Sequence, residues 1–275
     1  MDLTFSALQR SANEMRIDII RMLHAAGSGH PGGSLSVIDI LSVLFFRYIK
    51  RTPENVSDPN RHRLVLSKGH GVPALYAVLS RCGIIPHDDL LTLRQVDSDL
   101  QGHPHNGSFP AVEASTGSLG QGLSIAQGMA MTAKLDKKPY KVYCVIGDGE
   151  SQEGQIWEVL LSAPHFKLDN LIVVLDYNKG QIDGPTNKIL NLEPIGDKLR
   201  AFNWDVQEID GHDVQAIDAA VAHAQVENGR PHFIIANTLK GKGVSFMEHP
   251  TEWHGKAPNA AETEAAIKEL EALLN

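Results

Sequence analysis

The chain has little of what marks a secreted or membrane-bound protein. It contains two cysteines, Cys82 and Cys144, among 275 residues. They are too few and too far apart for a disulfide framework or a zinc site. The first twenty residues are amphipathic and charged, and they lack the basic start, apolar centre and cleavage site of a signal peptide. No apolar run is expected to approach the roughly 20 residues that span a bilayer. We therefore expect a cytoplasmic protein.

Positive charge is also scarce. The chain carries 25 Lys and Arg against 33 Asp and Glu, a formal net charge of -8. No basic block stands out, which argues against a nucleic-acid-binding surface, and an acidic balance does not favour adsorption to anionic membranes. We expect neither nucleic acid nor a membrane among its partners. With 42% hydrophobic residues, the chain is long enough for a full core.

Helical and extended patterns alternate along the sequence. Apolar residues at helical spacing predict a helix over 4–26, and Ser34 is expected to cap a second helix that ends near Tyr48. Short apolar runs predict strands over 63–67, 140–146, 170–175, 204–209 and 232–238. Further helices are expected within 68–83 and over 119–135, 154–166, 213–228 and 260–274, whereas 88–116 reads as irregular. This alternation predicts an α/β fold with a parallel sheet covered by helices on both faces. Without a repeat or linker, residues 1–275 are expected to form a single domain, with 260–275 as a C-terminal helix.

The stretch VIGDGESQEG, residues 145–154, places a charge at the end of an apolar run. Parallel α/β sheets bind ligands outside the carboxyl ends of their strands. The amides of Gly147 and Gly149 and the following helix start suit an anion, whereas Asp148 would repel one unless a divalent cation lay between them. Magnesium prefers such oxygen ligands. Asn178 follows the next strand, and one βαβ step would bring the two strand ends side by side.

Each of these motifs also has a simpler interpretation. An isolated GDG is most simply a tight turn, and TGSLGQG (116–122) is also consistent with a glycine run that packs a helix. TGSLGQG is not a P-loop, because it lacks the pattern G-x-x-x-x-G-K-[ST]. GDGESQEG is not a dinucleotide fingerprint, because it has Gln152 where the fingerprint needs glycine. His103 and His105 resemble the His-x-His of a metal hydrolase, but no further strand-end ligands can be placed. The charged loop 240–243 is consistent with a solvated turn and is assigned no role.

Four of the 13 histidines lie in loops rich in glycine and proline. They are His30 in GSGHPGG, His70 in SKGHG, His103 in QGHPH and His254 in WHGKAP. Such loops can face a cleft, and imidazoles transfer protons near neutral pH. A lone histidine is more often a surface or structural residue, so loop context alone supports only two of the four as functional.

The GDG sequence, followed after about thirty residues by an asparagine that ends an apolar run, is the pattern of thiamine-diphosphate-binding domains. The chain resembles the N-terminal, diphosphate-binding half of transketolase. The resemblance covers nearly the whole length, with these segments in the family's order: GSGHPGGSLS, LSKGHG, GHP, STGSLGQGLSIAQGMA, GDGESQEGQIWE, LDNLIVVLDYNKGQIDGPT, KGKGVSFME and HGKAP.

Carried onto the matching residues, the resemblance implies a magnesium site. Asp148, the side chain of Asn178 and the carbonyl of Gly180 would hold the ion, for which Ca²⁺ or Mn²⁺ could substitute. The resemblance also implies thiamine-diphosphate contacts, with Gly149 binding the diphosphate through its amide. The other contacts would come from Gly117, Leu119, Ile182, His70 and His254.

The resemblance further implies roles at the reaction centre and at a subunit boundary. His30, His70 and His254 would border the cofactor and reaction centre, and His103 would lie near the substrate's hydroxyls. Glu153 would lie at the inter-subunit surface, in a carboxylate network linked to the partner.

The resemblance implies an enzyme made of two chains. In the family, a second domain binds the aminopyrimidine and carries the glutamate that activates it, and residues 260–275 leave no room for that domain. The chain is therefore expected to be inactive alone and to form an α2β2 assembly with a second subunit that supplies the pyrimidine domain.

The implied reaction is transfer of a two-carbon ketol unit from a ketose phosphate to an aldose phosphate, as in the pentose phosphate pathway. The alternatives are a specialised two-subunit transketolase for unusual sugar phosphates, sulfosugars or a biosynthetic acceptor, a 1-deoxyxylulose-phosphate-synthase-like enzyme, and a non-catalytic scaffold subunit.

Overall fold

Five parallel strands form the central sheet of the computed structural model, which describes residues 3–248 and 251–274. The strand order is β1-β2-β3-β7-β6. Their bounds are β1 (Arg63–Leu66), β2 (Val142–Gly147), β3 (Leu171–Tyr177), β6 (Asp205–Asp210) and β7 (His232–Asn237). A short antiparallel ribbon of β4 (Gly180–Gln181) and β5 (Gly184–Pro185) follows β3. All five predicted strands are present, and each neighbouring pair is parallel.

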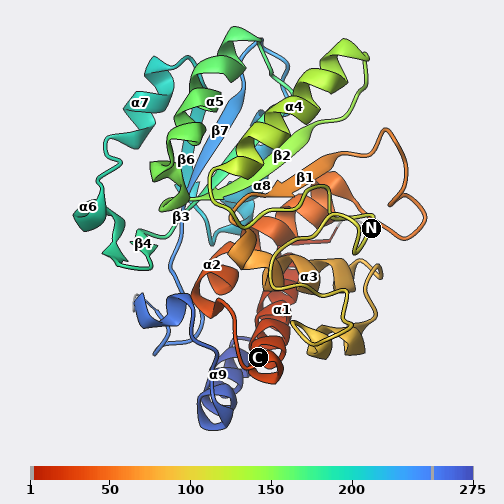
Figure 1. Cartoon of the computed structure of the whole chain (residues 1–275), viewed down its shortest axis with the longest axis vertical. Coiled ribbons are helices and arrows are strands. Elements are labelled where there is room, and N and C mark those ends of the chain that lie inside the picture. The colour runs from red at the N-terminus through yellow and green to blue at the C-terminus, as the bar shows by residue number, and fades with distance from the viewer. Residues whose placement is uncertain (1–2, 249–250, 275) are drawn as a thin grey trace.

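Helices cover both faces of this sheet (Figure 1). The core on one face is shared with α1 (Phe5–Ala26), α2 (Pro31–Val43), α3 (Val72–Arg81), α8 (Val214–His223) and α9 (Ala260–Ala272). The core on the other face is shared with α4 (Gln121–Leu135), α5 (Gly154–His165) and α7 (Ile195–Ala201). The short helix α6 (Thr186–Ile189) follows the β4–β5 ribbon. The predicted α/β architecture is confirmed.

Successive residues of β2 face the two opposite cores. Tyr143 and Val145 pack with α1, α2 and α3, whereas Val142 and Cys144 pack with α4 and α5. Side chains alternate along a strand, so a strand that is covered on both faces is apolar at every position. This explains why residues 142–146 form an unbroken apolar run.

Helix α2 begins earlier than its sequence predicts. It starts at Pro31, with His30 at the N-cap, and not at Ser34. Proline suits the first turn because its φ is already helical and its missing N–H needs no partner there. The Ser34 hydroxyl donates to the His30 carbonyl at 2.7 Å inside the helix. A Cβ at Gly32 would lie 2.9 Å from Cγ of Lys240, so the glycine permits this close approach.

The expectation that no apolar run approaches membrane-spanning length was wrong for one segment. Helix α2 and the π-helical turn Leu44–Ile49 together form a 19-residue apolar run. However, 83% of its most apolar window is buried inside the fold. The run is therefore explained by a helix that is enclosed by α1, α3 and α8 in the core.

The remaining differences concern boundaries and one region. Helix α4 begins at Gln121, because Gly120 before it has a left-handed φ of 87°. Helix α8 ends at His223, five residues short of its predicted end, 228. Helices α6 and α7 lie in a stretch for which no element was predicted. None of these differences moves the strand ends that form the candidate site.

Candidate functional site

The ends of β2 and β3 bring Asp148 and Asn178 to one edge of the sheet. Gly147 pairs with Asp176 in the parallel ladder, so the segments that follow leave the sheet together. One Asp148 oxygen also accepts a hydrogen bond from the Lys179 amide, which ties the two segments to each other. The sequence prediction that these strand ends adjoin is confirmed.

Two oxygen-bearing side chains at this edge are held by backbone amides. The second Asp148 oxygen accepts from the Gly149 amide at 2.8 Å, and Oδ1 of Asn178 accepts from the Gly180 amide at 3.1 Å. Asp148 is 2% exposed. Burial, and then repulsion from Asp176, raises its pKa to about 7. The carboxylate is therefore costly to ionise here, and a cation beside it would offset that cost.

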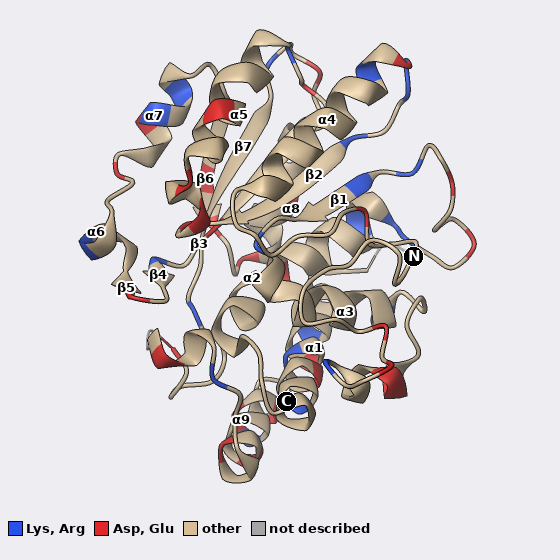
Figure 2. Ribbon diagram, in the orientation of Figure 1, with Lys and Arg blue, Asp and Glu red and all other residues tan. Residues whose placement is uncertain are grey.

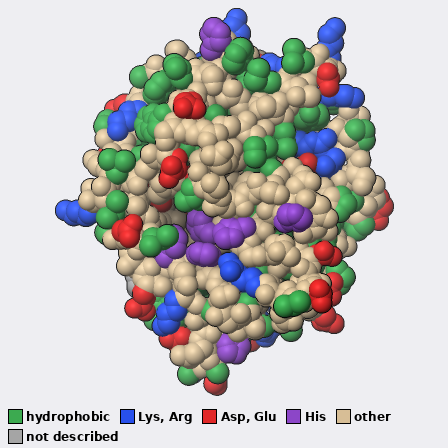
Figure 3. All heavy atoms as spheres, in the orientation of Figure 1, with side chains coloured by type: hydrophobic (Ala, Val, Ile, Leu, Met, Phe, Trp, Pro, Cys, Tyr) green, Lys and Arg blue, Asp and Glu red, His purple; other side chains and the backbone are tan. Residues whose placement is uncertain are grey.

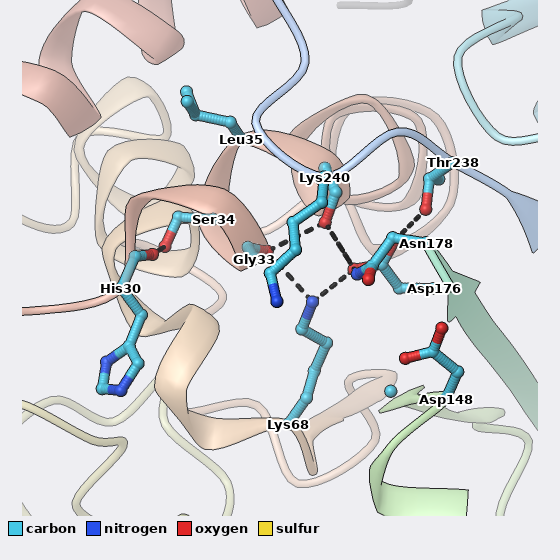
Figure 4. Close-up of polar contacts among 12 residues, drawn as sticks. His30, Gly33, Ser34, Leu35, Lys68, Asp148, Asp176, Asn178, Thr238 and Lys240 are labelled. Atoms are coloured by element: carbon cyan, nitrogen blue, oxygen red, sulfur yellow. Dashed lines mark hydrogen bonds and ion pairs between the residues drawn. The ribbon is translucent and has the colours of Figure 1, made fainter. Parts of the chain in front are cut away.

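A buried ion pair lies next to Asp148 (Figure 4). Lys68 follows β1 and pairs with Asp176 at the end of β3. Asp176 also accepts from the hydroxyls of Ser36, at 2.6 Å, and Thr238. Burial opposes ionisation of Asp176, but Lys68 and the hydroxyl groups outweigh it and lower its pKa. Acidic ribbon segments converge where β2 and β3 end (Figure 2), but the Asp176 charge is already paired within the protein.

One cleft at this edge collects most of the predicted cofactor and metal residues. Its lining includes His70, Leu119, Asp148, Gly149, Glu153, Asn178, Gly180, Ile182 and His254. Gly117, His30 and His103 are not among its lining residues. The ring of His30 adjoins those of the lining residues His70 and His254, and the ring of His103 adjoins that of His30. Gly117 lies two residues before Leu119 in the chain. The fold thus gathers in one place residues that are up to 184 positions apart in the chain (70 to 254).

The four predicted histidines form a cluster, and histidine side chains gather near the centre of the face in Figure 3. The ring centroid of His30 lies 5.4 Å from that of His70, 5.5 Å from that of His254 and 6.1 Å from that of His103. The rings of His70 and His254 stack at 5.2 Å. Four loops that are distant in sequence therefore deliver imidazoles to one site.

All four imidazoles have lowered pKa values, with burial as the largest cause. Neighbouring cations add to the effect. The pKa falls to about 4 for His30, where Arg94 contributes, and to about 3 for His254, where Lys240 contributes. The cluster is consequently neutral at neutral pH and can accept protons from a bound molecule.

Two glycines shape the floor of the site. Gly117 has a φ of +136°, and a Cβ there would lie 2.8 Å from Cδ2 of His103. A Cβ at Gly149 would lie 3.0 Å from Cβ of Gln181. A larger residue at either position would displace a neighbour, so each glycine permits the close approach of that neighbouring side chain.

The two buried lysines of the cleft were not predicted from the sequence. Lys68 and Lys240 both line it. Nζ of Lys240 lies 2.8 Å from Nδ1 of His254, and burial, with Lys68 next, lowers the Lys240 pKa to about 8. Both lysines lie in quoted motifs, LSKGHG and KGKGVSFME. A charge within three residues of the end of an apolar strand was the signal that could have identified them.

The acidic residues after GDG divide into a buried one and an exposed one. Glu150, to which no role was assigned, is 1% exposed. It accepts from the Ser67 hydroxyl and from the amides of Gly120 and Gly147, at 3.0 and 3.1 Å, and so holds three loops together. Glu153 is exposed at the rim of the cleft. Its contact with a partner stays a prediction.

The family model described as the transketolase thiamine diphosphate binding domain matches residues 7–272. The chain belongs to the transketolase family. Its fold agrees with a solved structure, the transketolase from Campylobacter jejuni subsp. jejuni NCTC 11168, with a TM-score of 0.90 and 35% identity. That match covers 98% of this chain and 43% of the other.

Relatives of two lengths match this transketolase-family chain. It is 47% identical to the 6-deoxy-6-sulfo-D-fructose transketolase subunit SqwG of Clostridium sp. (strain MSTE9), over 96% of each chain. It is 41% identical to an apulose-4-phosphate transketolase subunit of Actinobacillus succinogenes, over 98% of each. Against human transketolase the identity is 42%, over 96% of this chain but 42% of that one. The chain is the counterpart of the N-terminal subunit of a two-subunit transketolase, a transferase.

Proposed function

We propose that the chain binds Mg²⁺ and the diphosphate of thiamine diphosphate and, with a second subunit, transfers a two-carbon ketol unit from a ketose phosphate to an aldose phosphate. The observation that carries this proposal is the arrangement of Asp148 and Asn178 at adjoining strand ends, beside the amide of Gly149. A carboxylate, an amide oxygen and the backbone amide of Gly149 meet there on the wall of one cleft.

The donor set fits magnesium and a diphosphate. Mg²⁺ takes about six oxygen ligands, and it usually combines one or two carboxylates with substrate phosphates and water. Asp148, the Asn178 side chain and the Gly180 carbonyl would supply three protein oxygens. A bound cation would also offset the burial that raises the pKa of Asp148. The diphosphate would approach the Gly149 amide, where a side chain would crowd Gln181.

Apolar side chains of the cleft would hold the ring of the cofactor. Leu119 and Ile182 line the cleft and would pack against it, next to Gly117. When bound, thiamine diphosphate supplies a thiazolium carbon that, once deprotonated, takes up the ketol unit. The chain itself binds the diphosphate and orients the ring.

The histidine cluster would handle protons on the sugars. The imidazoles of His30, His70 and His254 lie within 5.5 Å of one another, centroid to centroid. Neutral imidazoles accept protons from hydroxyl groups and return them to developing alkoxides. His103, whose ring lies 6.1 Å from that of His30, would contact the hydroxyls of the sugar.

A second subunit would complete the site by supplying the pyrimidine domain and the activating glutamate, in an α2β2 assembly. Support comes from apolar side chains exposed beside the cleft. Ile182 is 69% exposed, and Ile189 and Leu190 are 45% and 56% exposed. Exposed apolar groups of this kind mark interaction surfaces when they cluster. Glu153, at the rim of the same cleft, would face the partner.

The test is co-expression of the chain with a candidate pyrimidine-domain subunit. Ketol transfer from xylulose 5-phosphate to ribose 5-phosphate is assayed with thiamine diphosphate and Mg²⁺. We expect activity from the complex and none from the chain alone. Asp148→Ala should abolish cofactor retention, whereas Asp183→Ala, which removes an exposed carboxylate from the same cleft, should preserve it. Equal retention by the two variants would refute the metal assignment.

A sulfosugar donor is the second candidate. The identity of 47% with the sulfofructose transketolase subunit exceeds the 41% and 40% with two apulose-4-phosphate transketolase subunits, over nearly whole chains in each case. Offering the complex 6-deoxy-6-sulfo-D-fructose and fructose 6-phosphate in separate assays distinguishes the two. A higher kcat/KM with the sulfonate would favour this candidate, and a higher kcat/KM with the phosphate would exclude it.

A further inference from the structure

A second group of ligand-type side chains lies at the opposite edge of the sheet. Asp205 begins β6 and His232 begins β7, and the two residues are paired in the parallel ladder. Helix α8 ends beside them at His223. Because the strands are parallel, this is their amino end, whereas the cleft lies at their carboxyl end. The elements that meet here are α8, β6 and β7 (Figure 1).

The three side chains are spaced as metal ligands are. Nε2 of His223 lies 3.4 Å from each Asp205 oxygen, and Nδ1 of His232 lies 3.7 Å from Oδ2. All three ligand atoms lie within 4.8 Å of one another. These separations exceed the 2.7–3.2 Å of ordinary N–H···O hydrogen bonds. The two Asp205–histidine separations are close to the edge of a tetrahedron with metal–ligand bonds of about 2.0–2.1 Å, which is roughly 3.4 Å.

The state of the His232 ring is fixed by its surroundings. Its Nε2 lies 2.9 Å from the Val226 carbonyl, which only accepts, so Nε2 carries the proton and Nδ1 carries the lone pair. The residue is 0% exposed, and within the described part of the chain Nδ1 has no hydrogen-bond partner. A buried nitrogen without a partner is unfavourable. A histidine that donates through one nitrogen to a carbonyl and directs the other at an ion is the usual arrangement in zinc sites.

The Asp205 carboxylate is oriented by a neighbour. Nδ2 of Asn228 donates to Oδ2 at 2.8 Å. Arg230 approaches the same oxygen at 3.5 Å, but its side chain is 53% exposed, so water screens its charge. A cluster of ion pairs is the alternative explanation, with a protonated His223 facing Asp205. That explanation leaves the unpartnered Nδ1 of buried His232 unaccounted for.

We propose that Asp205, His223 and His232 bind a divalent transition-metal ion, with water as the fourth ligand. Two imidazoles and one carboxylate in a tetrahedral arrangement suit Zn²⁺ best. The ion joins the start of the edge strand β6, the start of β7 and the end of α8. It lies at the amino end of the strands, remote from the cleft, and it is independent of the ketol-transfer proposal.

The test uses the full chain with thiamine diphosphate and Mg²⁺ present in excess, which keeps Zn²⁺ from the cleft. Zn²⁺ affinity is measured by competition with a chromophoric chelator, and the melting temperature is recorded with and without one equivalent of Zn²⁺. We compare His223→Ala with His165→Ala. Both residues are exposed histidines in the last turn of a helix, and the His223 side chain is 51% exposed. Neither substitution therefore opens a cavity in the core.

We expect Zn²⁺ to raise the melting temperature of the unmodified chain and of His165→Ala. In His223→Ala, the affinity should fall by at least about tenfold, since loss of an outer-shell group alone costs about 10- to 100-fold, and the shift should disappear. Co²⁺ should give the visible spectrum of a tetrahedral site in the same two proteins and lose it in His223→Ala. Equal affinity and equal thermal shift in all three proteins would overturn the proposal, and so would weak binding by the unmodified chain.

Discussion

The buried pair of Lys68 and Asp176 allows a sharp test of what supports the site. The two side chains are 1% and 0% exposed. Lys68→Met keeps the length of the side chain but removes its charge. Asp176 then retains its hydroxyl donors but loses the cation that outweighs its burial. Removing one partner of a buried ion pair costs about 3–5 kcal/mol, because it leaves an uncompensated charge. We expect a loss of that size in the free energy of unfolding.

Lys240→Met is the matched control. Lys240 is also buried in the cleft, at 2% exposed, and burial lowers its pKa to about 8. The group that its ammonium contacts, at 2.8 Å, is a neutral imidazole, that of His254, so its removal leaves no contacting carboxylate without its ion-pair partner. We expect a loss within about 1 kcal/mol, the value of an ordinary hydrogen bond. Urea unfolding of the full chain at pH 7.5, without cofactor, measures both variants.

The pH dependence supplies a second readout with a defined sign. In the unmodified chain the Asp176 pKa is lowered, so its contribution to stability is present above the unfolded value of about 3.9 and is lost only below it. In Lys68→Met the lone carboxylate should have a raised pKa. As the pH falls from 7.5 to 5, protonation of Asp176 removes its uncompensated charge in Lys68→Met. The difference in free energy of unfolding between this variant and the unmodified chain therefore narrows. Equal losses of unfolding free energy in Lys68→Met and Lys240→Met would refute the reasoning. A difference between Lys68→Met and the unmodified chain that stays constant with pH would also refute it.

Three further outcomes are expected. Lowering the pH from 7.5 to 5 should lower the melting temperature, because the folded chain holds His70 and His254 neutral whereas the unfolded chain protonates them below about 6.5. If the double variant His70→Gln, His254→Gln shows the same change of melting temperature with pH as the unmodified chain, this explanation fails. Gly117→Ala should lower the free energy of unfolding by about 1–3 kcal/mol, because the residue has a positive φ, and it should reduce ketol transfer. Gly128 has open space around it, so Gly128→Ala should be tolerated. Similar effects of the two substitutions would contradict the steric argument. Asn259→Ala removes the capping box of α9 and should cost about 1 kcal/mol in thermal unfolding; an unchanged melting temperature would show that the cap contributes nothing.

The central strands of the sheet, β2 and β3, could be predicted from the sequence because they are covered on both faces. The runs at 142–146 and 171–175 are apolar at every position, which follows from cores on either side. The start of α2 could not be placed in the same way. Ser34 is a good N-cap residue, but Pro31 already suits a first turn, and two glycines follow it where α2 passes Lys240 and His70. Tertiary contacts therefore decided where that helix begins.

The candidate site was predictable where a motif marked it, and not where burial alone defined it. Asp148 and Asn178 follow apolar runs directly, so the order of elements placed them together. Lys68 and Asp176 are 108 positions apart, and no spacing rule relates them. Glu150 and Glu153 look alike in the sequence, yet one is buried under three hydrogen bonds and the other is exposed. Only the folded chain distinguishes structural from accessible acids.

The hydrogen bond from the Lys179 amide to Asp148 crosses from one strand end to the next. It forms only when Gly147 lies beside Asp176, because a slip of one residue would turn the side chains of β3 to the opposite face. The shape of the cleft thus depends on correct strand pairing deep in the sheet. A chain with misaligned strands would have an equally apolar core, but its cleft would not hold a ligand. Ligand retention would therefore distinguish correctly paired chains from misaligned ones.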